Sequence, residues 1–315
     1  LEGFADMKRI IFSILVLSYV AAFSGSAAVI REVRVDPQAT SRPSTATTRP
    51  AGTGKLSIRV MGNNWGSASS VDIRKVLESA AGELLKSFPD RRLNPIIIQR
   101  GRMAPITLYR RGPKGEYLMK LTPDGQYWCQ FAYQFSHEFC HILANYSHKT
   151  PRANKWFEES LCEMASIYAL KRMAVAWKTH PPYERWKDYS KDIEAYADDL
   201  QKAEDKLPKG KTLASWYKEN SAALRRTPWL RAKNRIAANS MLTLFESNPS
   251  GWAAVSYLNS GKGESDSFQD YLSNWYRKTP AGRRKIVGDI IKMFGLRIPA
   301  IRADKQASGR DGSSR

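Results

Sequence analysis

The sequence is poor in cysteine and in acidic residues, and each scarcity narrows what the protein can be. Three cysteines in 315 residues form no disulfide framework, and they allow at most one bridge and one odd thiol. Thirty Asp and Glu residues against fifty Lys and Arg leave a net charge of +20, which favours acidic partners but says nothing about chemistry. With 42% hydrophobic and 25% charged residues, the composition is that of a globular protein, which excludes disordered, fibrous and multi-span membrane chains.

Only one long hydrophobic run is present, and it lies close to the start of the sequence. It covers residues 10–23, follows the cationic segment MKR at 7–9 and precedes the small residues at 25–28. This order is typical of a secretory signal peptide, and the run is too short for a comfortable membrane span. We therefore expect translation to begin at Met7, residues 1–27 to be a signal peptide and the protein to be exported. An uncleaved N-terminal membrane anchor is the alternative.

Two segments lack the apolar residues that a folded core requires. Residues 28–54 are rich in Pro, Ser and Thr, and the tail 301–315 is polar, so we expect both to be disordered. No internal repeat is evident. The folded domain should span 55–300, with an α/β part at 55–147 and a helical part at 148–300.

Hydrophobic periodicity predicts an α+β fold, in which a small mixed β-sheet with helices is followed by a mainly α-helical half. The expected strands cover residues 55–61, 95–99, 106–109 and 116–122, and a hairpin turn joins the last two. The expected helices cover residues 71–88, 128–146, 155–175, 183–203, 213–219, 228–246, 251–258, 268–276 and 281–294. The helix at 128–146 joins the two halves.

That joining helix contains an HExxH motif, the segment HEFCH at residues 137–141, which holds two of the four histidines of the chain. Residues four apart on an α-helix lie about 40° apart around its axis, so His137 and His141 project from one face and can bind one metal ion. Glu138 points to the side, where its carboxylate can hold a water on that ion. The spacing predicts two zinc ligands and one general base.

The segment WFEESLCE at residues 156–163 offers the third protein ligand that a zinc site requires. Glu159 and Glu163 are four residues apart and therefore on one face of the next helix. One of them can bind the metal, and the other can accept the N–H of a ligating histidine. Apolar residues border these carboxylates heavily, which is not expected of a solvated helix face.

Together these motifs resemble the gluzincin zinc metallopeptidases, the peptidase MA-like group that includes thermolysin-like and aminopeptidase N-like enzymes. In that group the HExxH helix is followed by a helix with the pattern Trp-x-x-Glu-x-x-x-Asp/Glu, which residues 156–163 match. The resemblance covers residues 104–170. It implies a zincin-like architecture around the active-site helix, with His137, His141 and Glu159 as ligands of Zn2+.

The resemblance also implies the remaining roles. Glu138 is expected to be the general base, Glu163 the carboxylate that supports a ligating histidine, and Glu158, one residue out of register, the alternative ligand. An edge strand beside the helix is expected to bind extended peptides by β-augmentation, and residues 116–122 are the candidate. The implied activity is hydrolysis of peptide bonds in peptide or protein substrates.

Two features of the family are missing from the sequence. No Gly-x-Met-Glu-Asn segment precedes the motif, so recognition of a free amino terminus is not expected. No Tyr or His aligns with a residue that stabilises the oxyanion. His180, Tyr183, Asn234 and Arg235 are candidates, although structural roles explain each of them better. The alternative function is therefore an inactive or weakly active relative that binds an anionic polymer or protein through its basic surface.

The cysteines and the basic residues are expected to have structural or surface roles and no part in the chemistry. Cys140 and Cys162 are expected to be buried, inert thiols where two helices pack closely, and a bridge between them is the alternative in an exported protein. Lys and Arg are dispersed and form no motif for specific nucleic-acid binding, so attachment to an anionic surface or polymer explains them better. No transmembrane segment is expected after signal cleavage.

Overall fold

The structure is a computed structural model that describes residues 56–146, 150–260 and 267–300. The predicted signal peptide (1–27), linker (28–54) and C-terminal tail (301–315) lie outside these ranges. None of the helices within them is both long and apolar enough to cross a membrane.

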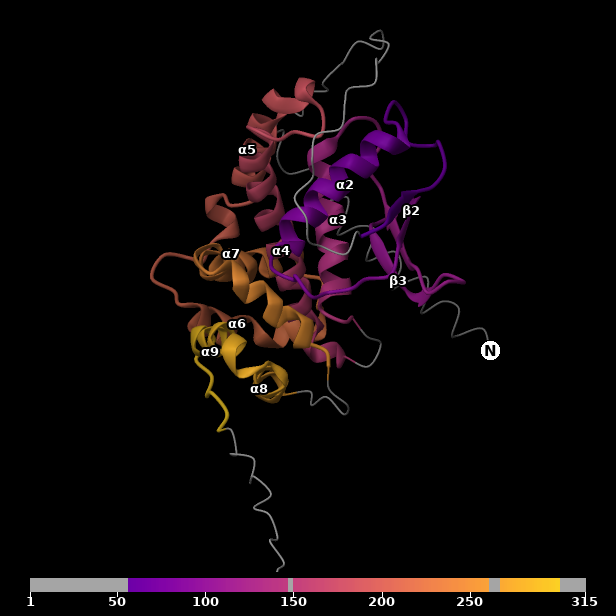
Figure 1. The fold of residues 1–315 in the computed structure, drawn as a ribbon. Helices are drawn as coiled ribbons and strands as arrows, with labels where there is room; N and C mark the ends of the chain where they lie inside the picture. Colours follow the sequence, from indigo (N-terminus) through magenta and orange to yellow (C-terminus); the bar gives the residue numbers. More distant parts are fainter. Residues whose placement is uncertain (1–55, 147–149, 261–266, 301–315) are drawn as a thin grey trace, which may run out of the picture.

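The described part of the chain is an α+β structure. Its four strands all precede α3 (Trp128–Leu143), and everything after α3 is helical or irregular. Figure 1 shows the strands on one side of the molecule and the C-terminal helices on the other, with α3 and α4 (Lys155–Trp177) between them. The expected order, a small mixed sheet followed by a helical half, is confirmed.

The strands form one sheet in the order β1-β2-β4-β3. β1 (Ile58–Val60), β2 (Ile96–Arg100) and β4 (Tyr117–Leu121) are parallel, and β3 (Ile106–Arg111) runs antiparallel to β4. The expectation that residues 116–122 form the edge is wrong, because β4 pairs with β2 on one side and with β3 on the other. The edge is β3. The physical reason lies in the sequences, since the apolar YLMKL suits an interior strand and the exposed, arginine-rich ITLYRR suits an edge.

The hairpin between β3 and β4 places the edge strand against α3. Gly115 adopts a φ of +77°, which glycine alone reaches without strain, and the Gly112 N–H donates to the Glu116 carbonyl at 2.9 Å. The Thr107 hydroxyl then donates to the backbone carbonyl of Glu138 at 3.1 Å. This contact fixes β3 beside the middle of the motif helix.

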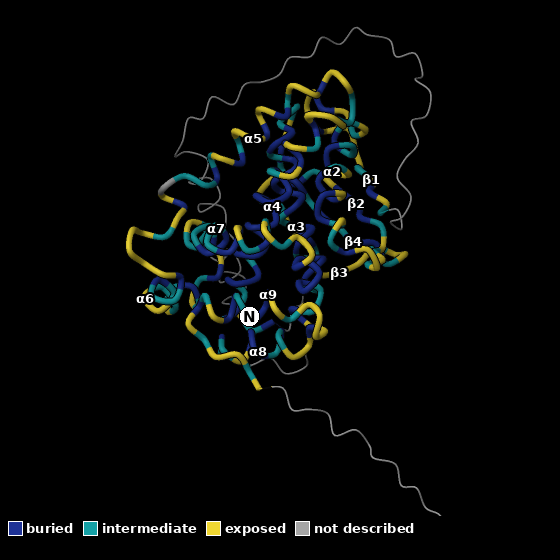
Figure 2. The backbone as a smooth tube through the Cα atoms, turned by 60° about the vertical axis from the view of Figure 1, so that its left-hand side comes forward, coloured by how far each residue is buried: buried dark blue, intermediate teal, exposed yellow. Residues whose placement is uncertain are grey.

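α4 is the central helix of the molecule. It packs against α2 (Ser70–Leu85), α3, α5 (Ser190–Asp199) and α7 (Arg231–Ser247), and most of its 23 residues are buried. A helix that is apolar on every side is expected to lie in a core. Figure 2 shows this as buried backbone running through α3 and α4, while the outer helices alternate between buried and exposed turns.

The remaining helices cover the rest of α4. They are α6 (Leu213–Arg226), α8 (Phe268–Lys278) and α9 (Arg284–Met293), with the 3-10 helices η1 (Arg152–Asn154), η2 (Glu184–Tyr189), η3 (Ala203–Asp205), η4 (Pro249–Tyr257) and η5 (Ala281–Arg283). The α-helix expected at 251–258 is therefore a 3-10 helix. Residues 251–255 are all buried, so the sequence holds no amphipathic period that would distinguish the two windings.

Candidate metal centre

The two motif histidines interrupt the buried surface of the second half of α3. Every residue from Phe131 to Leu143 is buried except His137 and His141, whose side chains are 18% and 16% exposed. Their ring centroids lie 5.2 Å apart, with the ring planes at 70°. The spacing of four residues therefore places both imidazoles on one face, as predicted, and that face is reachable from solvent.

α4 brings the carboxylate of Glu159 to these imidazoles. Its Oε2 lies 3.2 Å from His137 Nε2, and its Oε1 lies 3.8 Å from His141 Nε2. Zinc bonds of about 2.0–2.1 Å in a tetrahedral site separate neighbouring ligand atoms by about 3.3 Å. Glu159 thus faces Nε2 of both imidazoles near this spacing, through Oε2 toward His137 and through Oε1 toward His141.

The other nitrogen of each imidazole also faces a carboxylate. His141 Nδ1 lies 2.7 Å from Glu158 Oε1, and His137 Nδ1 lies 3.7 Å from Glu163 Oε2. A carboxylate on the far nitrogen fixes the tautomer of a ligating histidine and raises its basicity. Glu163 therefore lies where the sequence predicted. Glu158, the alternative ligand, lies behind His141 and on the opposite side from Glu159.

Glu158 is itself held from a distant part of the chain. Asn259 donates from its side-chain amide to Glu158 Oε2 at 2.9 Å and to the Ala144 carbonyl at 3.0 Å. Its amide oxygen accepts from the Tyr271 hydroxyl at 3.0 Å. Tyr271, Asn259 and Glu158 thus connect α8 to His141 through buried hydrogen bonds.

Glu163 belongs to a second buried network. It accepts from the Tyr133 hydroxyl at 2.6 Å and from Arg235 Nε at 2.8 Å, and Arg231 Nε lies 3.9 Å away. Burial would raise the pKa of Glu163, but the two guanidinium groups outweigh burial and hold that pKa at about 2. Glu163 therefore remains ionised behind His137.

The carboxylates closest to the imidazoles have no guanidinium or ammonium group beside them that would offset their negative charge. Within the described residues, no Lys or Arg forms an ion pair with Glu138, Glu158 or Glu159. Burial would lower the pKa of His141, but Glu159, Glu158 and Glu138 raise it well above its ordinary value. A proton on His141 thus supplies positive charge that this cluster requires, and a divalent cation would supply more.

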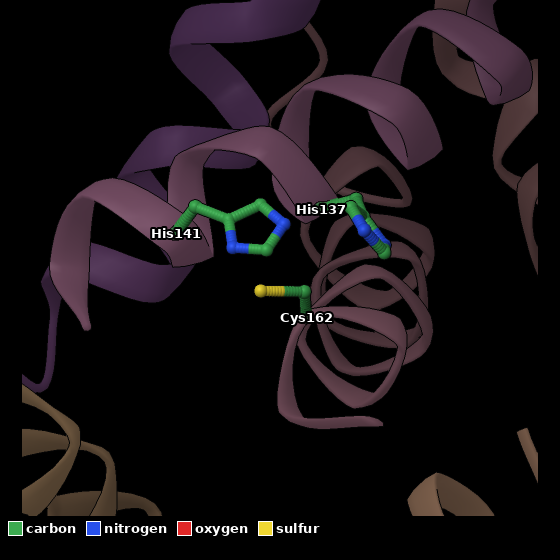
Figure 3. Close-up of side chains that lie close together, drawn as sticks. All are labelled: His137, His141 and Cys162. Carbon is green, nitrogen blue, oxygen red and sulfur yellow. The ribbon is translucent and has the colours of Figure 1, made fainter. Parts of the chain in front are cut away.

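Cys162 also lies beside the histidines, as Figure 3 shows. Its Sγ and one nitrogen from each imidazole lie within 4.8 Å of one another. The side chain is fully buried, and burial together with Cys140 raises the pKa of the Cys162 thiol well above its ordinary value. Because the thiolate is the form that binds metal, Glu159 is the better third ligand.

The suggested bridge between Cys140 and Cys162 is not formed. All three cysteines of the chain are free and buried, and the Cys140 and Cys162 thiols are hydrogen-bonded neighbours between α3 and α4. The alternative expectation, buried and inert thiols, describes them correctly.

Glu138 is oriented by the edge strand. Its Oε2 accepts from the Thr107 backbone N–H at 2.6 Å, and the residue is 5% exposed. Among the described residues Oε1 has no hydrogen-bond partner. One oxygen thus fixes the carboxylate, and the other remains able to take up a proton.

The four oxyanion candidates are all engaged elsewhere. His180 contacts Thr179 at 2.8 Å, and Tyr183 packs edge-on against Trp186. Asn234 is buried and donates to the Pro228 carbonyl, while Arg235 binds Glu163 and Asp205. Structural roles are therefore observed for these four side chains.

Sequence reasoning missed several residues that support the site, among them Thr107, Tyr133, Arg231, Asn259 and Tyr271. Tyr133 could have been found, because it lies four residues before His137 on the same helix face. Nothing in the local sequence marks Asn259 or Tyr271, which reach Glu158 only through tertiary packing.

No protein-family model, curated protein or solved structure matches this chain.

We expect Glu158→Gln to weaken zinc binding by about 10- to 100-fold, because His141 loses the carboxylate on its far nitrogen. Asn259→Ala should also weaken zinc binding, but by a smaller factor. Competition with a chromophoric chelator measures both, and Asn234→Ala, another buried amide, serves as the control with unchanged affinity. If Glu158→Gln lost zinc completely while Glu159→Gln retained it, Glu158 would be the metal ligand and Glu159 the supporting carboxylate.

Glu163→Ala should destabilise the metal-free protein by about 3–5 kcal/mol, because it leaves two guanidinium groups without their buried partner. Urea unfolding gives the free energy of unfolding. Glu246→Ala removes the half-exposed ion pair with Lys171 and should cost about 1 kcal/mol or less. Equal costs for the two variants would contradict the importance of the buried network.

Proposed function

We propose that this protein is an exported zinc-dependent peptidase of the gluzincin type. The observation that carries the proposal is the approach of Glu159 to Nε2 of both His137 and His141, while Nδ1 of each faces a further carboxylate. Such a set of two imidazoles and one carboxylate leaves the fourth position of a tetrahedral ion open, as catalytic zinc sites do. The antiparallel edge strand β3 over the motif helix is in keeping with the zincin-like architecture that the family resemblance implies.

The chain supplies the proton transfers that hydrolysis requires. A zinc ion bound by His137, His141 and Glu159 would lower the pKa of a coordinated water and polarise the substrate carbonyl. Glu138, held through Oε2 by Thr107, would take the proton of that water on its other oxygen and pass it to the leaving amine. Glu158 and Glu163 keep the two imidazoles in the orientation that presents Nε2.

Export is part of the proposal and is supported by the cationic and apolar order of residues 7–28. The free cysteines do not oppose it, because all three are buried and protected from oxidants.

The test is metal analysis of the purified protein, followed by incubation with a mixed peptide library with and without a chelator. One zinc per chain and cleavage that the chelator abolishes and zinc restores would support the proposal. Zinc-free protein that cleaves nothing, yet binds anionic polymers in a salt-dependent way, would favour the alternative of a basic binding protein.

A further inference from the structure

The edge strand and its flanks have an unusual surface. Residues 100–114 carry five cations and no carboxylate. They also carry three of the eight exposed large hydrophobic side chains in the described part of the chain: Met103 at 47%, Ile106 at 47% and Tyr109 at 41%. Cations are a common protection of an edge strand against self-association, but exposed apolar side chains beside them work against that protection.

Two of these five cations are already engaged, and three are not. Arg100 pairs with Asp124 at 2.9 Å, and Arg111 lies over the Tyr117 ring, 3.5 Å from its centroid. The other three, Arg102, Arg110 and Lys114, are exposed and form no ion pair with any residue that the structure describes.

A further cation reaches Tyr109 from α4. Lys155 Nζ lies 3.2 Å from the Tyr109 hydroxyl. Arg110 follows Tyr109 directly in β3, and successive side chains of a strand point to opposite faces, so the two cations flank the end of the strand on either face.

This cluster of Tyr109, Arg110 and Lys155 is close to the proposed general base. The Thr107 N–H contacts Glu138 at 2.6 Å, and Arg110 is three residues further along β3. At about 3.3 Å per residue, Arg110 lies roughly 10 Å along the strand from Thr107, beside which the reacting bond of a substrate would lie. A ligand that extends along β3 would therefore bring the side chain two or three residues from that bond to the cluster.

We propose that β3 binds an extended acidic peptide, whose carboxylates face Arg110 and Lys155 two or three residues from the bond that is cleaved. The position of the cleaved bond rests on the proposed function, whereas the binding does not require zinc. A strand edge offers backbone groups at the spacing of another peptide chain, and on β3 these lie beyond the Thr107 N–H and the Leu108 carbonyl, which Glu138 and Tyr146 already engage. Single-stranded nucleic acid instead requires a series of stacking aromatics, and Tyr109 is the one exposed aromatic ring on β3.

The experiment measures binding to the full-length Glu138→Gln protein, which prevents turnover. Three labelled eight-residue peptides carry Glu, Gln or Lys at the same two positions, and fluorescence anisotropy gives each Kd at low and high salt. We expect the Glu peptide to bind at least about tenfold more tightly than the Gln peptide, with the difference shrinking as salt rises. Arg110→Glu should reverse the preference toward the Lys peptide. Arg283→Glu, the same charge change at η5, should leave the preference intact.

Three outcomes would overturn the inference. The Glu and Gln peptides could bind equally, Arg283→Glu could weaken binding as much as Arg110→Glu, or an oligonucleotide of equal charge could compete as well as the Glu peptide. A different result would refute the proposed function. Wild-type protein without zinc or cleavage, in which the charge preference persists, would refute the peptidase and support acidic-peptide binding by β3.

Discussion

Glu138→Gln is expected to keep one zinc ion per chain and to lower kcat by about 10²- to 10⁴-fold, the range that a positioned general base contributes. The amide oxygen of glutamine can still accept the Thr107 N–H, so β3 and α3 should remain together. The amide cannot take up the water proton. Metal analysis and single-turnover cleavage of a substrate from the peptide library measure the two effects separately.

Glu194→Gln is the matched control, since this α5 carboxylate is half-exposed and pairs only with Lys178. Its kcat should equal that of the wild type. A Glu138→Gln protein as active as the wild type on the same peptide would remove Glu138 from the mechanism, and simultaneous loss of zinc would make it a ligand.

His141→Ala is expected to lose both zinc and activity, because it removes a ligand and leaves Glu158 and Glu159 facing each other without a cation. In the wild type, free zinc at 100 times its Kd should stabilise the fold by about 2.7 kcal/mol. For a domain of this size that corresponds to a rise in Tm of roughly 5–10 °C. The variant should show no such rise when zinc is added.

His180→Ala provides the comparison, because the His180 side chain is exposed and its ring contacts Thr179 rather than any residue of the site. It should retain the zinc-dependent rise in Tm and full activity. If His141→Ala still gained stability from stoichiometric zinc, the metal would have to bind elsewhere.

The sequence by itself determined the elements and the motif. Its apolar spacings located the strands and nearly all helices, since local periodicity reflects which face of an element is buried. The interval of four residues between His137 and His141 placed both imidazoles on one helix face, because the geometry of an α-helix is the same in every protein. Spacing likewise set Glu159 and Glu163 on one face of α4.

Only the tertiary structure decided which strand is the edge and what each carboxylate touches. Residues 106–109 and 116–122 form a hairpin whichever of them is outside, and the pairing of β4 with β2 settles the order. Glu158 and Glu159 are neighbours in sequence, yet the crossing of α3 and α4 turns one to Nδ1 of His141 and the other to Nε2. Asn259 reaches Glu158 from 101 residues away, and no local pattern records such a contact, because it forms only when distant helices pack.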